Sequence, residues 1–362
     1  MTKLLEDIVR EPGELAKVWG YGFGPGRQTL DEAARILRDA AVVFIVGMGS
    51  SWNAGCAVLN AFQEQGRTAI LVDASELLHF GKVASGAAVI VLSRSGKSAE
   101  IVKLIPELRA RNCRLIAITN TPDSPLALGA DVTVLLDAVF DHQVSVTMYS
   151  ALALVGCALA RLSTGSLDQS IAPELTVALA ESTRAFSVWQ EKLAKTSWLN
   201  PASPTYFLGR GSGLASCHEA RLLWEEAAKV PASAMPTGGF RHGPQEMIRE
   251  GVRIAMWIDG QRMRREDLAL ARDLREYGAV VLLIGQELPE DAADVVLNLP
   301  RISPEWQFVL EIIPIQLAAE RLSHLNSEDC DAFRLCSYIV EDEGGLSPKN
   351  ADRAKTRRVP QK

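Results

Sequence analysis

The sequence lacks the features that mark secreted, membrane-spanning and metal-binding proteins. Its six cysteines lie far apart and form no C-x-x-C pair or Cys/His cluster, so we expect reduced thiols in the core and no metal site. The first residues carry acids where a signal peptide needs an apolar core, and no uncharged run approaches membrane-spanning length. These absences predict a cytoplasmic protein that does not enter a membrane.

A large block of basic residues is also missing. The net charge is −6 over 362 residues, which argues against a nucleic-acid-binding surface. Hydrophobic residues make up 48% of the chain, enough for buried cores, and the length suits two domains of ordinary size.

The stretch at residues 89–101, VIVLSRSGKSAEI, is the most informative one in the chain. An apolar run stops at Ser93, and an amphipathic helical pattern begins after Ser98. Three hydroxyls, a glycine and the unpaired N–H groups of a helix N-terminus can bind an anion such as phosphate. Serine and glycine are also ordinary capping residues at such a turn, so the turn alone leaves both interpretations open. A P-loop is excluded, because the glycine that its spacing requires falls on Val91.

Apolar strands alternate with amphipathic helices along the first half of the chain. We expect strands at residues 42–46, 69–72, 89–92, 114–119 and 131–136. We expect helices at residues 3–19 with a break at Pro12, then at 30–38, 54–65, 99–110 and 148–162, and a glycine-rich loop at 20–26. This alternation predicts a parallel sheet covered by helices on both faces.

A similar series of elements begins again after a charged helical connector at residues 174–195. The segment YFLGRGS at 206–212 echoes FIVGMGS at 44–50, and a comparable order follows: strands at 253–258, 280–284 and 294–297, then a closing helix at 306–322. We therefore predict an α/β fold of two tandem doubly wound parallel-sheet sandwiches of flavodoxin-like layout.

The repeat also sets the expected division of the chain. The expected parts are an N-terminal helical segment at 1–35, a first domain at 36–165, a helical connector at 166–200, a second domain at 201–343 and a tail at 344–362. Because the tail is rich in charge and short of apolar residues, we expect it to be disordered or loosely draped.

The two glycine-rich turns that follow the first strand of each half do not match a dinucleotide fingerprint. Gly47-x-Gly49 has Trp52 where the third glycine should stand, and the turn at 209–213 has the wrong spacing. We therefore expect no cofactor. Asp73, at the end of the second expected strand, leaves a nucleotide-dependent oxidoreductase as a remote alternative. The turns are better explained as tight corners at the carboxyl edge of a sheet, where such folds bind ligands.

A third stretch, in the second half, offers acid–base groups. Glutamates on a helix usually form a solvated face, and we interpret Glu225 so, but Glu226 closes a helix whose start abuts the expected ligand edge. His242 lies in the loop GGFRHGP, which gives its side chain no apolar face to pack against. Histidine titrates in the range that acid–base catalysis needs, but the pattern alone leaves its role open.

Four motifs in this order resemble the double sugar-isomerase (SIS) domain family. They are GMGSSWN at 47–53, SRSGKS at 93–98, GRG at 209–211 and FRHGP at 240–244. The resemblance covers residues 3–343. The family includes the isomerase half of glucosamine-6-phosphate synthase, tagatose-6-phosphate ketose/aldose isomerase-like proteins and fructosamine-phosphate deglycases.

The resemblance implies a role for each matching residue. The residues implied to bind the sugar phosphate are Ser50, Ser51, Ser93, Arg94, Ser95 and Ser98, with Arg94 standing where glutamine is frequent. Glu226 would move a proton between C1 and C2 of the sugar, and His242 would open the ring. In the family this histidine comes from the neighbouring subunit, which implies a homodimer with the active site at the subunit interface.

Two departures from the family argue against Schiff-base chemistry of the synthase type. Leu223 and Cys336 stand where synthase-type members have lysines. No glutamine-hydrolysing domain precedes the repeats, so we do not expect glutamine to supply ammonia within this chain. The expected function is isomerisation of a hexose or amino-sugar 6-phosphate, with coupled deamination or deglycation also open. A non-catalytic sugar-phosphate sensor is the alternative: the missing lysines favour it, while both acid–base positions and the lack of a DNA-binding segment argue against it.

Overall fold

Short runs of apolar residues form the strands of the first sheet in the computed structural model, which describes residues 1–168 and 170–346. The strands are β1 (Val43–Gly47), β2 (Ala69–Asp73), β3 (Ala88–Leu92), β4 (Arg114–Thr119) and β5 (Val132–Leu135). All pair in parallel, in the order β2-β1-β3-β4-β5. Alternate residues of β3 enter two cores: Ile90 packs on one face of the sheet, Val89 and Val91 on the other.

Helices cover both faces of this sheet. The helices of this half are α1 (Lys3–Phe23), which packs on other helices, and α2 (Arg27–Asp39), α3 (Ser50–Gln63), α4 (Ala74–His79), α5 (Ala99–Ala110), α6 (Pro125–Gly129) and α7 (Thr147–Thr164). Helix α7 is long and apolar enough to cross a membrane, yet 89% of it is buried inside the protein. It is therefore the central core helix of the first half.

The second sheet repeats the first. Its strands are β6 (Thr205–Gly209), β7 (Ser233–Pro236), β8 (Arg253–Ile258), β9 (Val280–Gln286) and β10 (Val295–Leu299). Their order from one edge is β7-β6-β8-β9-β10, the same as in the first sheet and typical of flavodoxin-like folds. The remaining helices are α8 (Ile171–Lys195), α9 (Gly213–Glu226), α10 (Thr237–Phe240), η1 (Pro244–Met247), α11 (Arg264–Glu276), η2 (Pro304–Trp306), α12 (Phe308–Glu311) and α13 (Ile313–Leu325). The predicted fold of two tandem α/β sandwiches is confirmed.

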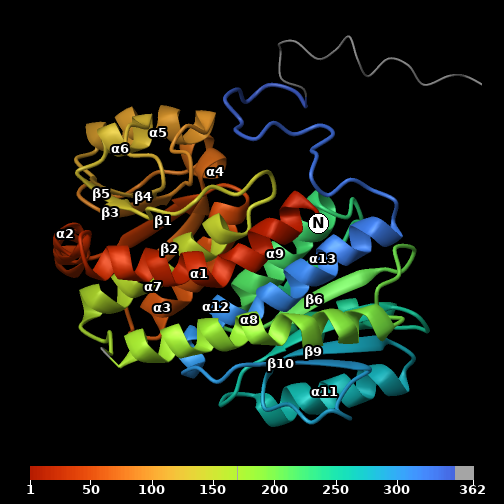
Figure 1. Ribbon diagram of the computed structural model, residues 1–362. Coiled ribbons are helices and arrows are strands. Elements are labelled where there is room, and N and C mark those ends of the chain that lie inside the picture. The colour runs from red at the N-terminus through yellow and green to blue at the C-terminus, as the bar shows by residue number, and fades with distance from the viewer. Residues whose placement is uncertain (169, 347–362) are drawn as a thin grey trace, which may run out of the picture.

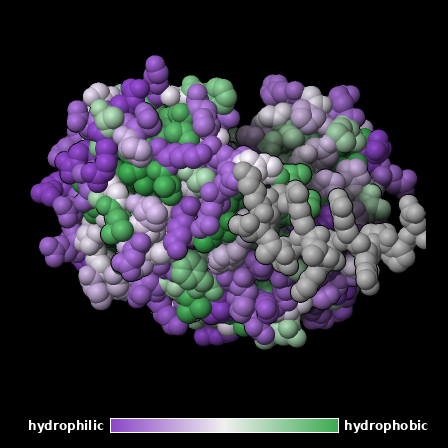
Figure 2. All heavy atoms as spheres, turned by 90° about the horizontal axis from the view of Figure 1, so that it is seen from above, coloured by the Kyte–Doolittle hydropathy of each residue, from purple (hydrophilic) through white to green (hydrophobic). Residues whose placement is uncertain are grey.

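The two halves share one apolar core. It extends from α1, α3 and α7 to α9, α13 and the second sheet. Helices α1, α8 and α13 run between the two sheets, and the segment after α13 turns back toward the first sheet (Figure 1). Figure 2 shows hydrophilic side chains over most of the face seen from above, with hydrophobic ones between them. The carboxyl edges of the two sheets therefore belong to one continuous body.

The predicted break in the N-terminal helix is wrong. Helix α1 runs through Pro12 to Phe23, and its buried face includes Ile8, Pro12 and Leu15. A proline inside a helix costs about 3 kcal/mol, and burial of several such side chains offsets that cost. The predicted glycine-rich loop shrinks accordingly, because the first part of 20–26 belongs to the helix.

Three other expectations need correction. Helix α3 begins at Ser50 rather than at 54, because Gly49, with φ of +53°, makes the turn in a single residue. The loop expected around His242 begins within the short helix α10 and ends at the start of η1. The closing helix of the second half is split, and α13 starts beside Pro314, which lacks the N–H that a continuous helix needs. In the predicted tail, residues 347–362 lie outside the described residues.

Candidate functional site

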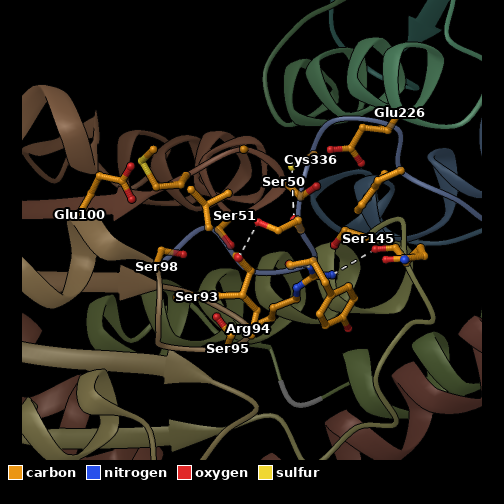
Figure 3. A pocket seen from close by; sticks show the side chains of 18 of the residues that line it. Ser50, Ser51, Ser93, Arg94, Ser95, Ser98, Glu100, Ser145, Glu226 and Cys336 are labelled. Carbon is orange, nitrogen blue, oxygen red and sulfur yellow. Dashed lines mark hydrogen bonds between the residues drawn. The ribbon is translucent and has the colours of Figure 1, made fainter. Parts of the chain in front are cut away.

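One cavity, of about 270 Å³, lies at the carboxyl edge of the first sheet. Among its lining residues are Ser50, Ser51, Ser93, Arg94, Ser95, Ser98 and Glu226. In Figure 3, Ser93, Ser95 and Ser98 lie on one side of the cavity and Glu226 lies on the other. Every predicted site residue except His242 therefore meets in one place.

The loop between β3 and α5, at residues 93–98, forms the hydroxyl-rich side of the cavity, and we call it the serine-rich loop. The Ser93 Oγ accepts a hydrogen bond from the Gly96 N–H at 3.0 Å, and the Ser95 Oγ accepts one from the Lys97 N–H at 3.3 Å. Each hydroxyl thus keeps its own hydrogen to donate to a ligand. Ser98 occupies the N-cap of α5 but makes no capping hydrogen bond with its side chain. Helix capping therefore does not explain why a hydroxyl stands at position 98. The hydroxyls of this loop can donate hydrogen bonds to an anion.

Only glycine fits at the centre of this loop. Gly96 has φ of +62°, and a Cβ there would lie 2.2 Å from the Ser124 Oγ. The close approach presses the loop against the start of α6 and holds its hydroxyls in place.

The first turn of α3 forms the floor of the cavity. The Ser50 Oγ donates to Glu219 Oε1 at 2.9 Å, and the Asn53 Nδ2 donates to Glu219 Oε2 at 2.8 Å. Burial raises the pKa of Glu219 to about 8, although both hydrogen bonds oppose the rise. Sequence reasoning missed Glu219 as a site residue. Its spacing of two helical turns from Glu226 on α9 was the available signal.

Glu226 ends α9 and is half-buried at the cavity wall. Within the described residues its carboxyl group has no hydrogen bond or ion pair. Burial raises its pKa to about 7, while the positive charge of Arg94 opposes the rise and the negative charge of Glu225 adds to it. A carboxyl group with this pKa can both accept and return a proton near neutral pH.

The segment that follows α13 closes the cavity. Its lining residues are Phe333, Cys336, Ser337, Tyr338, Ile339 and Val340. The Val340 carbonyl oxygen accepts from the Ala99 N–H at the start of α5, at 3.0 Å. Arg94 stacks on the Tyr338 ring and donates to its carbonyl oxygen at 2.7 Å. Apart from position 336, this segment was not expected at the site.

The two departures from the family lie in different surroundings. Leu223 is fully buried in the core and does not line the cavity, whereas Cys336 is exposed and does. Burial of part of its surface and the nearby Glu226 carboxylate raise the pKa of the Cys336 thiol. The expectation of core thiols is wrong for Cys336, because its segment packs over the cavity rather than within a sheet. It is confirmed for Cys56, Cys113, Cys157, Cys217 and Cys330, which are buried and free.

Comparison with known proteins agrees with this geometry. Residues 36–160 match the SIS domain family. The glutamine–fructose-6-phosphate aminotransferase (isomerizing) of Mycolicibacterium smegmatis is 25% identical over 366 residues, covering 94% of this chain and 57% of that protein. The chain thus spans little more than half the length of this curated relative. The predicted family resemblance is confirmed by the family match.

Solved structures share the fold over nearly the whole chain. The C-terminal domain of glucosamine-fructose-6-phosphate aminotransferase from Francisella tularensis has a TM-score of 0.80 at 22% identity, covering 91% of this chain and 98% of that one. Glucosamine-6-phosphate deaminase from Thermotoga maritima has a TM-score of 0.78 at 21% identity, covering 94% and 99%. The fold of two tandem α/β sandwiches is therefore shared with both structures.

The second half of the chain fills its own corresponding edge with one ion pair and one hydrogen-bonded carboxylate. After β6, where the first domain has its serine-rich turn, Arg210 binds the buried Asp267 through Nε at 3.0 Å. After β8, where the first domain has Ser93, the carboxylate of Asp259 accepts from the N–H groups of Gln261 and Arg262. A carboxylate takes up the backbone donors that would otherwise bind an anion, so this edge does not repeat the hydroxyl-rich loop.

His242 lies apart from the cavity of its own chain. It follows α10, is exposed to solvent and is not among the residues that line the cavity. One chain therefore assembles the hydroxyl-rich loop and Glu226 without His242. The role of this histidine stays a prediction.

Proposed function

We propose that this chain binds a six-carbon sugar or amino-sugar 6-phosphate and moves a proton between C1 and C2, interconverting aldose and ketose. One observation carries the proposal: Glu226, with its pKa raised to about 7, faces the same cavity as the serine-rich loop. The relatives support the substrate class, since one is named for fructose 6-phosphate and another for glucosamine-6-phosphate deamination.

In this proposal the two sides of the cavity divide the chemistry. Ser93, Ser95 and Ser98 hold the phosphate group, which fixes the sugar's reactive end near Glu226. The carboxylate takes the proton from one of the two adjacent carbons and returns it to the other, through an enediol. With an amino group on the sugar, the corresponding intermediate is an enaminol, which becomes an imine; water then adds to the imine carbon, and ammonia or an amine leaves as the C–N bond breaks. Deamination and deglycation are therefore variants of one reaction here.

We propose further that the chain acts as a homodimer whose partner supplies His242 for ring opening. The exposed position of His242 after α10, away from its own cavity, supports this. Histidine can both give and take a proton near neutral pH, as opening a cyclic sugar requires.

Proton NMR in deuterated buffer tests the reaction. A panel of hexose, hexosamine and fructosamine 6-phosphates is followed at C1 and C2 with wild type, Glu226→Gln and Glu225→Gln. We expect exchange or conversion with wild type and with Glu225→Gln, and none with Glu226→Gln. Glu225 is the matched control because it lies on the same helix, pairs with Arg221 at 2.6 Å and does not line the cavity.

Binding without any exchange would favour the second candidate, a sugar-phosphate sensor. The observation in its favour is that neither Leu223 nor Cys336 offers an amine. A sensor would return every sugar of the panel unchanged.

A further inference from the structure

A buried carboxyl group links the two halves of the chain beside the cavity. Glu219, on α9 of the second domain, is 1% exposed and accepts hydrogen bonds from Ser50 and Asn53, on α3 of the first. Ser50 also lines the cavity, so this residue both contacts Glu219 and borders the ligand space. Glu219 lies two turns before Glu226 on the same helix, and the reaction proposed above makes no use of it.

The Ser50 hydroxyl has a single hydrogen, which it can donate either to Glu219 or to a ligand in the cavity but not to both. When Glu219 is ionised, Ser50 donates its hydrogen to that carboxylate and offers the cavity only lone pairs, which repel a phosphate oxygen. When Glu219 is neutral, its own O–H can donate to the Ser50 oxygen. The Ser50 hydrogen is then free to donate to a phosphate oxygen in the cavity.

We propose that Glu219 is a positioning residue that sets the direction of the Ser50 hydroxyl, so that Ser50 donates to the ligand phosphate only while Glu219 is neutral. The inference rests on the proposed function in one respect, namely that the ligand is a phosphate ester. It adds a specific consequence: phosphate binding weakens when Glu219 loses its proton.

The groups around Glu219 support a neutral carboxyl at pH 7. Burial raises its pKa to about 8, and the charge of Glu226 on the same helix adds to the rise. The hydrogen bonds from Asn53 and Ser50 and the charge of Arg221 oppose it. Tyr149, on α7, is another titratable group close enough to interact with it: burial raises the pKa of that phenol, and the charge of Glu219 adds to the rise. Ionisation is therefore expected above pH 8.

The test measures fructose 6-phosphate affinity from pH 7 to 9.5 in a Glu226→Gln background, which removes turnover and the titration of Glu226. A phosphate monoester is already a dianion across this range. We expect the affinity to fall about tenfold as pH rises, the effect of one lost hydrogen bond to a charged group. Adding Glu219→Gln should make the affinity constant within about twofold, because the carboxamide N–H keeps donating to Ser50 and its oxygen keeps accepting from Asn53.

Glu311→Gln is the matched control. Glu311 is also buried, accepts from Ser216 and Gln307 at 3.0 Å and has its pKa raised to about 7, but it does not line the cavity. This control should keep the tenfold fall. Ser50→Ala is a second test that leaves Glu219 in place, and it should remove the fall.

The outcomes separate the two proposals. A fall that persists in Glu219→Gln or in Ser50→Ala would overturn the role of Glu219, as would constant affinity in the Glu226→Gln background alone. Absence of binding by any sugar phosphate of the panel, at any pH, would overturn the proposed function together with this inference.

Discussion

The guanidinium group of Arg94 lies 3.9 Å from the centre of the Tyr338 ring and donates to the Tyr338 carbonyl oxygen at 2.7 Å. The contact joins the serine-rich loop at residues 93–98 to the segment that closes the cavity. It also places a positive charge close enough to Glu226 to lower the pKa of that carboxyl group. The residue that stands where the family often has glutamine therefore has both a packing role and an electrostatic one.

Removing this charge should shift the pH dependence of proton transfer. Wild-type C1/C2 exchange should rise with pH through about 7, because the base must be ionised and the pKa of Glu226 lies there. In Arg94→Gln the midpoint should move to higher pH, since the opposing positive charge is gone. Exchange rates in deuterated buffer between pH 5.5 and 9 give both midpoints. An unchanged or lower midpoint would contradict the assigned electrostatic role.

The serine-rich loop should govern binding rather than chemistry. Ser93→Ala combined with Ser95→Ala removes two hydroxyls whose hydrogens are free to donate, and should weaken sugar-phosphate affinity by about 10- to 100-fold. The exchange rate at saturation should stay within about threefold of wild type if the sugar is still seated against Glu226. Titration calorimetry and saturation kinetics separate the two effects. A collapse of the saturated rate with unchanged affinity would reverse the assigned roles.

Subunit complementation tests where His242 acts. Glu226→Gln and His242→Asn should each be inactive alone, because one lacks the base and the other the ring-opening group. If the active site forms between two subunits, random mixing of the variants restores about a quarter of the wild-type sites, each combining the intact residues of both chains. Activity after mixing and subunit exchange gives this fraction. Recovery of none would place both residues in the same subunit's site or refute the dimer.

Stability should fall as pH rises, because buried carboxyl groups in this protein are held neutral. Burial raises the pKa of Glu11 to about 8 from 4.5, so the folded state binds its proton more tightly than the unfolded state does. That contribution is complete below pH 4.5 and is lost as pH rises toward 8. Glu11→Gln should reduce the loss of stability between pH 6 and 9 by an amount on the order of 2 kcal/mol.

Thermal unfolding at both pH values measures this effect. Glu6→Gln is the control, since Glu6 lies on the same helix with an exposed side chain, and it should follow wild type. Part of the fall should remain in Glu11→Gln, because Glu219 and Glu311 are also buried with raised pKa values. A fall as steep as in wild type would show that Glu11 is ionised in the folded protein.

The sequence by itself determined the elements and their repeated order. The strand at 114–119 and the helix starting at Ala99 lie where their patterns predict them, because apolar spacing within a few residues decides whether a segment packs as strand or helix. The serine-rich loop could also be predicted from the sequence, since its hydroxyl-bearing residues and its glycine are adjacent in the chain. Helix α1 shows the limit: proline at position 12 predicts a break that only core packing overrides.

Tertiary structure alone decided how the site is completed. Ser50 and Glu219 are 169 residues apart, and Arg94 and Tyr338 are 244 apart, so no local pattern links them. Their contacts exist because α3 and α9, from different domains, share one core and the segment after α13 folds back over the first sheet. The same packing buries Glu219 and half-buries Glu226. The loss of water around the two carboxyl groups brings their pKa values near neutrality, and this loss depends on the packing rather than on the residue type.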